Sequence, residues 1–137
     1  MTSLAGYLVF LVIFGICDAL WLGIMGKVLY RPALGDLLLE RIRFVPALIF
    51  YFGFPIGVVY FALMPALATG SWTLALGNGA LLGLIAYGTY DLTNLATLRP
   101  WKLSITVADM VYGTVVTGAG AALSFFAVRL LAGWGWL

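Results

Sequence analysis

Histidine is absent from this chain, and cysteine occurs once, at Cys17. Without imidazole the chain has no histidine ligand for haem and no histidine general base. A single thiol excludes an internal disulfide and a Cys-x-x-Cys site for a metal. The side chains left for chemistry are carboxylates, tyrosines, hydroxyl groups and a few bases, so we expect no metal site and no cofactor.

Charged residues are also scarce, at 9% of the 137 residues, whereas 64% are hydrophobic. Soluble domains contain about 25% charged residues, so this chain cannot cover a globule with a soluble surface. The net charge of +2 is too small and too scattered to indicate binding to nucleic acid. The composition therefore predicts an integral membrane protein with a single transmembrane domain over residues 1–137.

Four apolar stretches are each long enough to cross a bilayer, which takes about 20 helical residues. They lie at about residues 4–26, 44–68, 74–98 and 103–131. No ten-residue alternation indicates strands of a β-barrel, so we predict an all-α bundle of four transmembrane helices. The first stretch has no basic residue before it, and we interpret it as a retained span and not as a signal peptide.

The connections between these spans differ in charge. Six of the seven basic residues lie between spans one and two or between spans three and four. The positive-inside rule then places both of these connections in the cytoplasm and both termini on the non-cytoplasmic side. In the first connection, Leu34, Leu37, Leu38 and Arg41 recur at helical spacing, which predicts a short amphipathic helix on the cytoplasmic surface.

The third span contains a polar stretch, residues 86–98, inside its apolar run. Polar groups that lack partners cost roughly several kcal/mol each in hydrocarbon. At 100° per residue, its polar side chains fall on an arc of roughly half the helix: Tyr87, Tyr90, Asp91, Thr93, Asn94 and Thr97. We interpret this arc as one wall of an intramembrane polar site.

Spans one, three and four each contain one aspartate: Asp18, Asp91 and Asp109. Each lies seven to nine residues from a basic residue of the cytoplasmic connections. At about 1.5 Å per residue, all three lie roughly 10–14 Å from the cytoplasmic boundary. A carboxylate within the membrane costs on the order of 2–3 kcal/mol, and no lysine or arginine lies at this depth. Protonation of one or more carboxyl groups, or hydrogen bonds from neighbours, would then stabilise them.

The predicted site combines these acids with the polar and aromatic side chains at the same depth. Asp91, Asp109 and Asp18 are candidate acid/base groups, although the sequence does not decide whether the protein is an enzyme. The candidate ligand-binding residues are Asp18, Trp21, Tyr87, Tyr90, Asp91, Thr93, Asn94, Thr106, Asp109 and Tyr112.

Small residues and prolines predict how the spans pack. Pro55, between Gly53 and Gly57, predicts a kink in the second span. Gly79 and Gly83 form a small-x-x-x-small strip, which predicts a close helix contact. The fourth span has one stripe of small and polar residues: Thr106, Asp109, Gly113, Thr117, Gly120 and Ser124.

Three of these segments carry a resemblance to a known family. They are Asp18-Ala19-Leu20-Trp21-Leu22-Gly23 followed by Tyr30-Arg31 and Leu34-Gly35, the stretch 86–98, and Asp109 with Gly113-Thr114. They resemble the domain-of-unknown-function 2177 family, whose members are bacterial inner-membrane proteins with four predicted spans. The resemblance covers nearly the whole chain, with Tyr112 at a position where we expected tryptophan. It implies the fold and a bacterial inner-membrane location, but no activity.

Three functions are compatible with these residues. In the first, the site opens to the inner leaflet and handles a lipid or isoprenoid-like small molecule, with Asp91 and Asp109 as an acid/base pair. In the second, the carboxylates bind a proton or cation in a transporter subunit, which would act as a homo-oligomer because four spans are too few to enclose a pathway. In the third, the aspartates form a clasp between helices of a structural or regulatory membrane protein.

Overall fold

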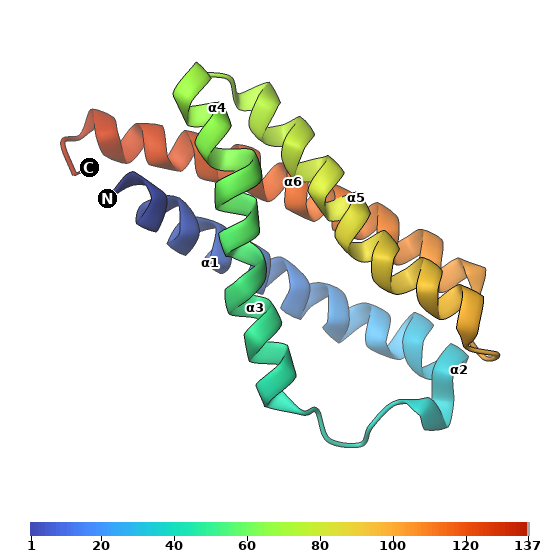
Figure 1. Ribbon diagram of the computed structural model, residues 1–137. Helices are drawn as coiled ribbons and strands as arrows, with labels where there is room; N and C mark the ends of the chain where they lie inside the picture. Colours follow the sequence, from blue (N-terminus) through green and yellow to red (C-terminus); the bar gives the residue numbers. More distant parts are fainter. Residues whose placement is uncertain (137) are drawn as a thin grey trace.

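The computed structural model describes residues 1–136, and these fold into four long helical segments without a strand (Figure 1). The first segment is α1 (Thr2–Met25), continued by the π-turn η1 (Gly26–Tyr30), α2 (Arg31–Leu34) and the 3₁₀ turn η2 (Gly35–Leu37). The second combines α3 (Phe44–Val58), the π-turn η3 (Val59–Leu63) and α4 (Met64–Thr69). The third and fourth are α5 (Trp72–Thr97) and α6 (Leu103–Gly133). The prediction of an all-α bundle is confirmed.

Three of these segments are long and apolar enough to cross a membrane: Thr2–Leu37, Phe44–Thr69 and Leu103–Gly133. The polar stretch keeps α5 out of this set, although its 26 residues are sufficient in length. α5 lies alongside α6 for most of its length, while α3 crosses the other helices steeply (Figure 1). Both termini lie at the same end of the bundle as the connection between α4 and α5 (Figure 1).

The contact between α5 and α6 depends on small residues, as the sequence predicts. A Cβ atom added to Gly79 would lie 2.9 Å from the backbone oxygen of Thr117 and 2.8 Å from the Cβ of Ala121. The stripe predicted on α6 is buried along its whole length, from Thr106 to Ser124. Because these positions have little or no side chain, the two backbones approach closely.

Pro55 and Pro65 interrupt the hydrogen bonding of the second segment, and other helices supply donors near both. Pro65 has no N–H, so it cannot donate to the carbonyl oxygen of Phe61 four residues earlier. Asn78 of α5 donates to that oxygen through its Nδ2 at 3.1 Å. Close to Pro55, the hydroxyl of Tyr7 donates to the backbone oxygen of Phe52 at 3.1 Å. Such donors from neighbouring helices allow proline within a membrane helix.

Replacement of Asn78 by leucine is therefore expected to lower the free energy of unfolding by about 1 kcal/mol, since one interhelical hydrogen bond is lost. The measurement is the thermal unfolding midpoint of the detergent-solubilised protein, with Leu81→Ala, an exposed position on the same helix, as a control. An Asn78→Leu protein as stable as the wild type would contradict this role of Asn78.

The helix predicted between the first two spans is shorter than its leucine spacing indicates. Gly35 has a φ of +47°, and Leu38 is already extended. Leu34 is buried, whereas Leu37 and Leu38 are exposed. The predicted short helix is therefore present as α2 and η2, but it does not reach Arg41, because the positive φ at Gly35 ends the regular helix.

Candidate functional site

Asp18 on α1, Asp91 on α5 and Asp109 on α6 all lie in the interior of the bundle. Asp18 and Asp109 are each 7% exposed, and Asp91 is fully buried. Asp109 interacts with both of the other acids. We call these three residues the carboxylate cluster.

Apolar residues enclose the cluster on both sides along the helix axes. Toward the termini lies the main core, in which Phe10 and Phe14 of α1 stack with ring centroids 5.6 Å apart. Toward the basic connections, Leu34, Trp101 and Ile105 form a second buried group. The acids are therefore in a low-dielectric layer, where each polar interaction is stronger than at a solvated surface.

Asp18 is bound by a tyrosine from another helix. The hydroxyl of Tyr51, on α3, donates to Oδ2 of Asp18. Tyr112 of α6 also lies beside Asp18, but its buried hydroxyl has no hydrogen-bond partner within residues 1–136. The bond between Tyr51 and Asp18 ties α3 to α1 at the level of the cluster.

Asp109 is the acceptor at the end of a chain of hydrogen bonds. The indole Nε1 of Trp21 donates to the hydroxyl oxygen of Tyr30 at 2.9 Å, and that hydroxyl donates to Oδ1 of Asp109. Hydrogen bonds to a carboxylate are about twice as strong as neutral ones. This chain therefore places a donor on the carboxyl group of Asp109 and ties α1 and η1 to α6.

The π-turn η1 explains how Tyr30 reaches this position. Trp21 and Tyr30 are nine residues apart, and in an uninterrupted α-helix they would lie on opposite faces. η1 covers Gly26–Tyr30, and a π-turn shifts the register of the residues after it. Beyond η1 the chain turns away from the axis of α1 (Figure 1). Both side chains can then face the same acid.

Asp91 has the least support of the three acids. Neither of its carboxyl oxygens has a hydrogen-bond partner within residues 1–136, and its carboxyl group interacts directly with that of Asp109. Two carboxylates about 4 Å apart would repel each other by about 4 kcal/mol at an effective dielectric constant of 20. The arrangement is therefore unfavourable when both acids are charged.

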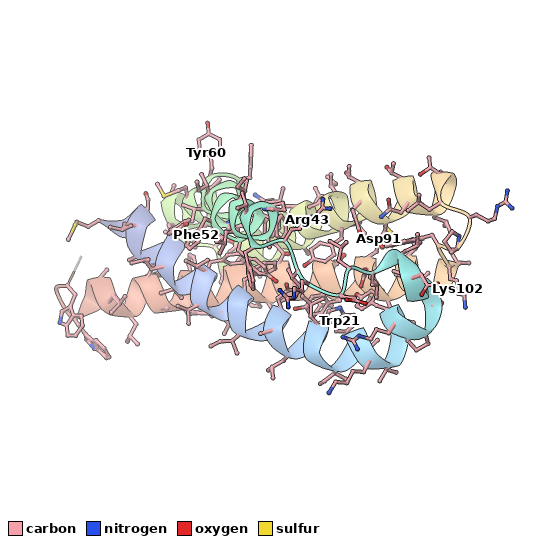
Figure 2. The ribbon with its side chains drawn as sticks, turned by 90° about the horizontal axis from the view of Figure 1, so that it is seen from below. Trp21, Arg43, Phe52, Tyr60, Asp91 and Lys102 are labelled. Carbon is pink, nitrogen blue, oxygen red and sulfur yellow. The ribbon has the colours of Figure 1, made fainter. Side chains whose placement is uncertain are left out.

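Aromatic rings separate the cluster from the outer surface of the bundle. Trp21 stacks on Tyr112 with a centroid distance of 4.1 Å and an interplanar angle of 10°. Tyr87 of α5 meets Tyr112 edge to face at 6.1 Å. Trp21 and Asp91 both point into the interior, whereas Tyr60 points away from it (Figure 2).

A shallow groove of about 490 Å³ lies outside these rings. Its sides are apolar, and Trp21 and Tyr112 belong to its lining, together with Val107, Ala108, Val111 and Val115. The three valines are exposed on the outer face of α6. The groove therefore opens toward the surroundings of the bundle, and its aromatic lining lies between it and the acids.

Thr106 has a structural position beside the cluster. Its buried hydroxyl accepts a hydrogen bond from Nε1 of Trp101 at 3.0 Å and lies 3.5 Å from the backbone oxygen of Asp91. Trp101 is buried, although indoles at span ends usually lie in the headgroup region. These contacts hold the start of α6 against α5.

Part of the predicted arc on α5 lies outside the cluster. Tyr90 and Thr93 are exposed, and Asn94 is half-buried. The hydroxyls of Thr93 and Thr97 donate to the backbone oxygens of Thr89 and Thr93 of their own helix. A threonine can satisfy its hydroxyl in this way, so these positions need no polar neighbour.

Tyr30 and Tyr51 were not among the residues predicted to form the site. Tyr51 lies eight residues after Arg43, which falls within the range of separations from a basic residue found for the three aspartates, so its position in the sequence already indicates the same layer. Tyr30 belongs to a segment that resembles the family motif, but its approach to Trp21 depends on the π-turn. Within the described residues, no group of three metal-binding side chains could hold a metal ion.

Comparison with protein families gives a match over most of the chain. A family model described as "Predicted membrane protein (DUF2177)" matches residues 3–126. Neither the curated proteins nor the solved structures contain a match to the chain. The matched residues include the carboxylate cluster, Tyr30, Tyr51 and the aromatic lining of the groove.

Proposed function

The chain belongs to the DUF2177 family of predicted membrane proteins, and we propose that it handles a lipid or isoprenoid-like small molecule through the carboxylate cluster. The protein is a multi-pass membrane protein with several apolar helices. In our proposal it lies in a bacterial inner membrane, α5 crosses the bilayer as the fourth span, and both termini are non-cytoplasmic. The site is then in the cytoplasmic half of the membrane.

The observation that carries this proposal is that two aromatic side chains, Trp21 and Tyr112, lie between the groove and the acids and border both. An alkyl or isoprenoid chain in the groove would pack against Val111 and Val115. Burial of apolar surface stabilises a complex by about 25 cal/mol per Å² only where the surface would otherwise contact water. Inside a bilayer the surface contacts lipid, so the shape of the groove and its aromatic rings would have to select the ligand. Trp21 and Tyr112 form both the groove lining and the contacts to the acids.

A polar end group would gain most from the carboxylate cluster. A hydroxyl or amine that reaches between the rings would meet Asp18 or Asp109, and a donor in this low-dielectric layer is bound more strongly than in water. Displacement of the stacked pair of Trp21 and Tyr112 would open that path. The rings thus act as a gate between the groove and the acids in this proposal.

The test is native mass spectrometry with lipidomics on gently purified protein. We expect the wild type to retain a defined lipid or isoprenoid, and Val111→Phe, which fills the groove, to retain it at least about tenfold less, which corresponds to about 1.4 kcal/mol. Asp109→Asn, which alters an acid that the end group would meet, is expected to lose the ligand as well. Val12→Phe, at an exposed valine of α1 outside the groove, is the matched control. If all four proteins carry only bulk phospholipid, the proposal fails.

The two bonds from tyrosine to aspartate favour a second candidate function, in which the acids form a structural clasp. Tyr51 with Asp18 and Tyr30 with Asp109 each join two helical segments. A clasp needs hydrogen bonds but not charge, so Asp→Asn variants would keep both the fold and the cellular function. Ligand loss from a stable Asp109→Asn protein would argue for the lipid site.

A further inference from the structure

Asp91 and Asp109 form an acid pair with very unequal surroundings. Asp91 is fully buried, and both of its carboxyl oxygens lack a hydrogen-bond partner within residues 1–136. Its carboxyl group faces that of Asp109, which accepts a hydrogen bond from Tyr30. Buried polar groups in native proteins are nearly always hydrogen-bonded, so the pair needs a donor between the two carboxyl groups.

We propose that Asp91 and Asp109 bind one proton, which is carried by Asp91 and donated in a hydrogen bond to Asp109. In this state Asp91 is a neutral carboxylic acid, and Asp109 is a carboxylate that accepts from Asp91 and from Tyr30. The O–H bond of Asp91 forms as an O–H bond of a hydronium ion breaks and releases water, and no other bond changes. A pair of neighbouring carboxyl groups that shares one proton is a known way to avoid two adjacent negative charges.

The neighbours determine which acid carries the proton. The chain from Trp21 through Tyr30 ends on Asp109 and stabilises its charge. No such donor reaches Asp91 within the described residues. With the proton on Asp91, the charge lies on Asp109, which accepts from both Asp91 and Tyr30. With the proton on Asp109, the charge would lie on the fully buried Asp91, whose only donor among the described residues would be Asp109.

The surroundings of the pair fit a proton better than a metal cation. Among the described residues, no three His, Cys, Asp or Glu side chains, those of the carboxylate cluster included, are placed so that they could hold a metal ion. Hard cations such as Ca²⁺ also take six to eight oxygen ligands. The side chains that interact with the pair from the neighbouring elements are acids, hydroxyls and one indole. They are Asp18 and Trp21 of α1, Tyr30 of η1, and Tyr87 and Tyr90 of α5.

The test is infrared spectroscopy of the purified protein in lipid vesicles, in H₂O and D₂O at neutral pH. A protonated carboxyl group gives a C=O stretching band that shifts in D₂O. We expect this band in the wild type, its loss in Asp91→Asn, and its retention in Asp36→Asn, whose aspartate is exposed in the connection after α2. In Asp109→Asn the band should remain but move, because the acceptor changes from a carboxylate to an amide.

Several results would overturn the proposal. These are a wild type without the band, an Asp91→Asn protein that keeps it, and a band that disappears when Na⁺ is added at constant pH. Asparagine reproduces the shape and the donor of a neutral aspartic acid. Asp91→Asn should therefore unfold at the wild-type temperature or above. Failure of this variant to fold would also contradict the proposal. The proton pair lies in the same cluster as the proposed lipid site, but the two are tested separately. If the purified protein shows the band and carries no defined lipid, lipid handling is rejected and the shared proton is supported.

Discussion

Replacement of Gly83 by alanine is expected to lower the free energy of unfolding by about 3 kcal/mol, at the upper end of the usual cost of overpacking. A Cβ atom at this position would overlap the backbone oxygen of Gly113 and lie 2.8 Å from the Cβ and Oγ1 of Thr117. The backbone of α6 cannot move away without opening its contact with α5. We expect little folded Gly83→Ala protein in detergent, measured by size exclusion and by the thermal unfolding midpoint.

Gly77→Ala on the same helix is the matched control. No atom outside its own turn lies within 4 Å of a Cβ at Gly77. Alanine is the better helix former by up to about 1 kcal/mol, so this variant should be as stable as the wild type or more stable. Equal stability of Gly83→Ala and Gly77→Ala would show that α5 and α6 do not pack at Gly83 as the structure has it.

The second large effect is expected at Tyr30. Tyr30→Phe removes the donor to Asp109 and the acceptor of the Trp21 indole, so two buried polar groups lose their partner. The loss of a hydrogen bond to a charged group costs about 1.5–3 kcal/mol, and we expect a decrease of about 2–3 kcal/mol in the free energy of unfolding. Denaturant or thermal unfolding of the purified variants measures it.

Two control experiments test whether the cost of Tyr30→Phe comes from its hydrogen bond to Asp109 or from the loss of a tyrosine hydroxyl in general. Tyr60→Phe alters a tyrosine that is exposed and points away from the bundle (Figure 2), and it should leave stability unchanged. In Asp109→Asn the buried charge is absent, so the additional cost of Tyr30→Phe should be smaller there than in the wild type. Equal costs in both backgrounds would mean that Tyr30 does not act through Asp109.

Some features of the candidate site were predicted from single residues of the sequence, and others were not. The depth of Asp18, Asp91 and Asp109 along their spans predicted a common layer, and Asp109 does interact with both of the other acids. The predicted arc on α5 was too wide, because threonine can bond to the backbone of its own helix and needs no polar neighbour. Thr93 is an example.

The sequence by itself determined the class of protein, the positions of the helices and the three acids of the cluster. These follow from local properties: hydropathy over about 20 residues, the positions of the bases, and the rise of a helix. The stripe of small residues on α6 followed from the same periodicity and is buried as predicted.

Only the tertiary structure decided which groups bind the acids. Tyr51 reaches Asp18 because α3 crosses α1, and Tyr30 reaches Asp109 because a π-turn shifts the register of the chain after α1. Neither event is local to the residues involved, since a crossing angle and a π-turn depend on how whole helices pack. For the same reason only the structure distinguished Asp109, which receives a donor, from Asp91, which receives none within the described residues.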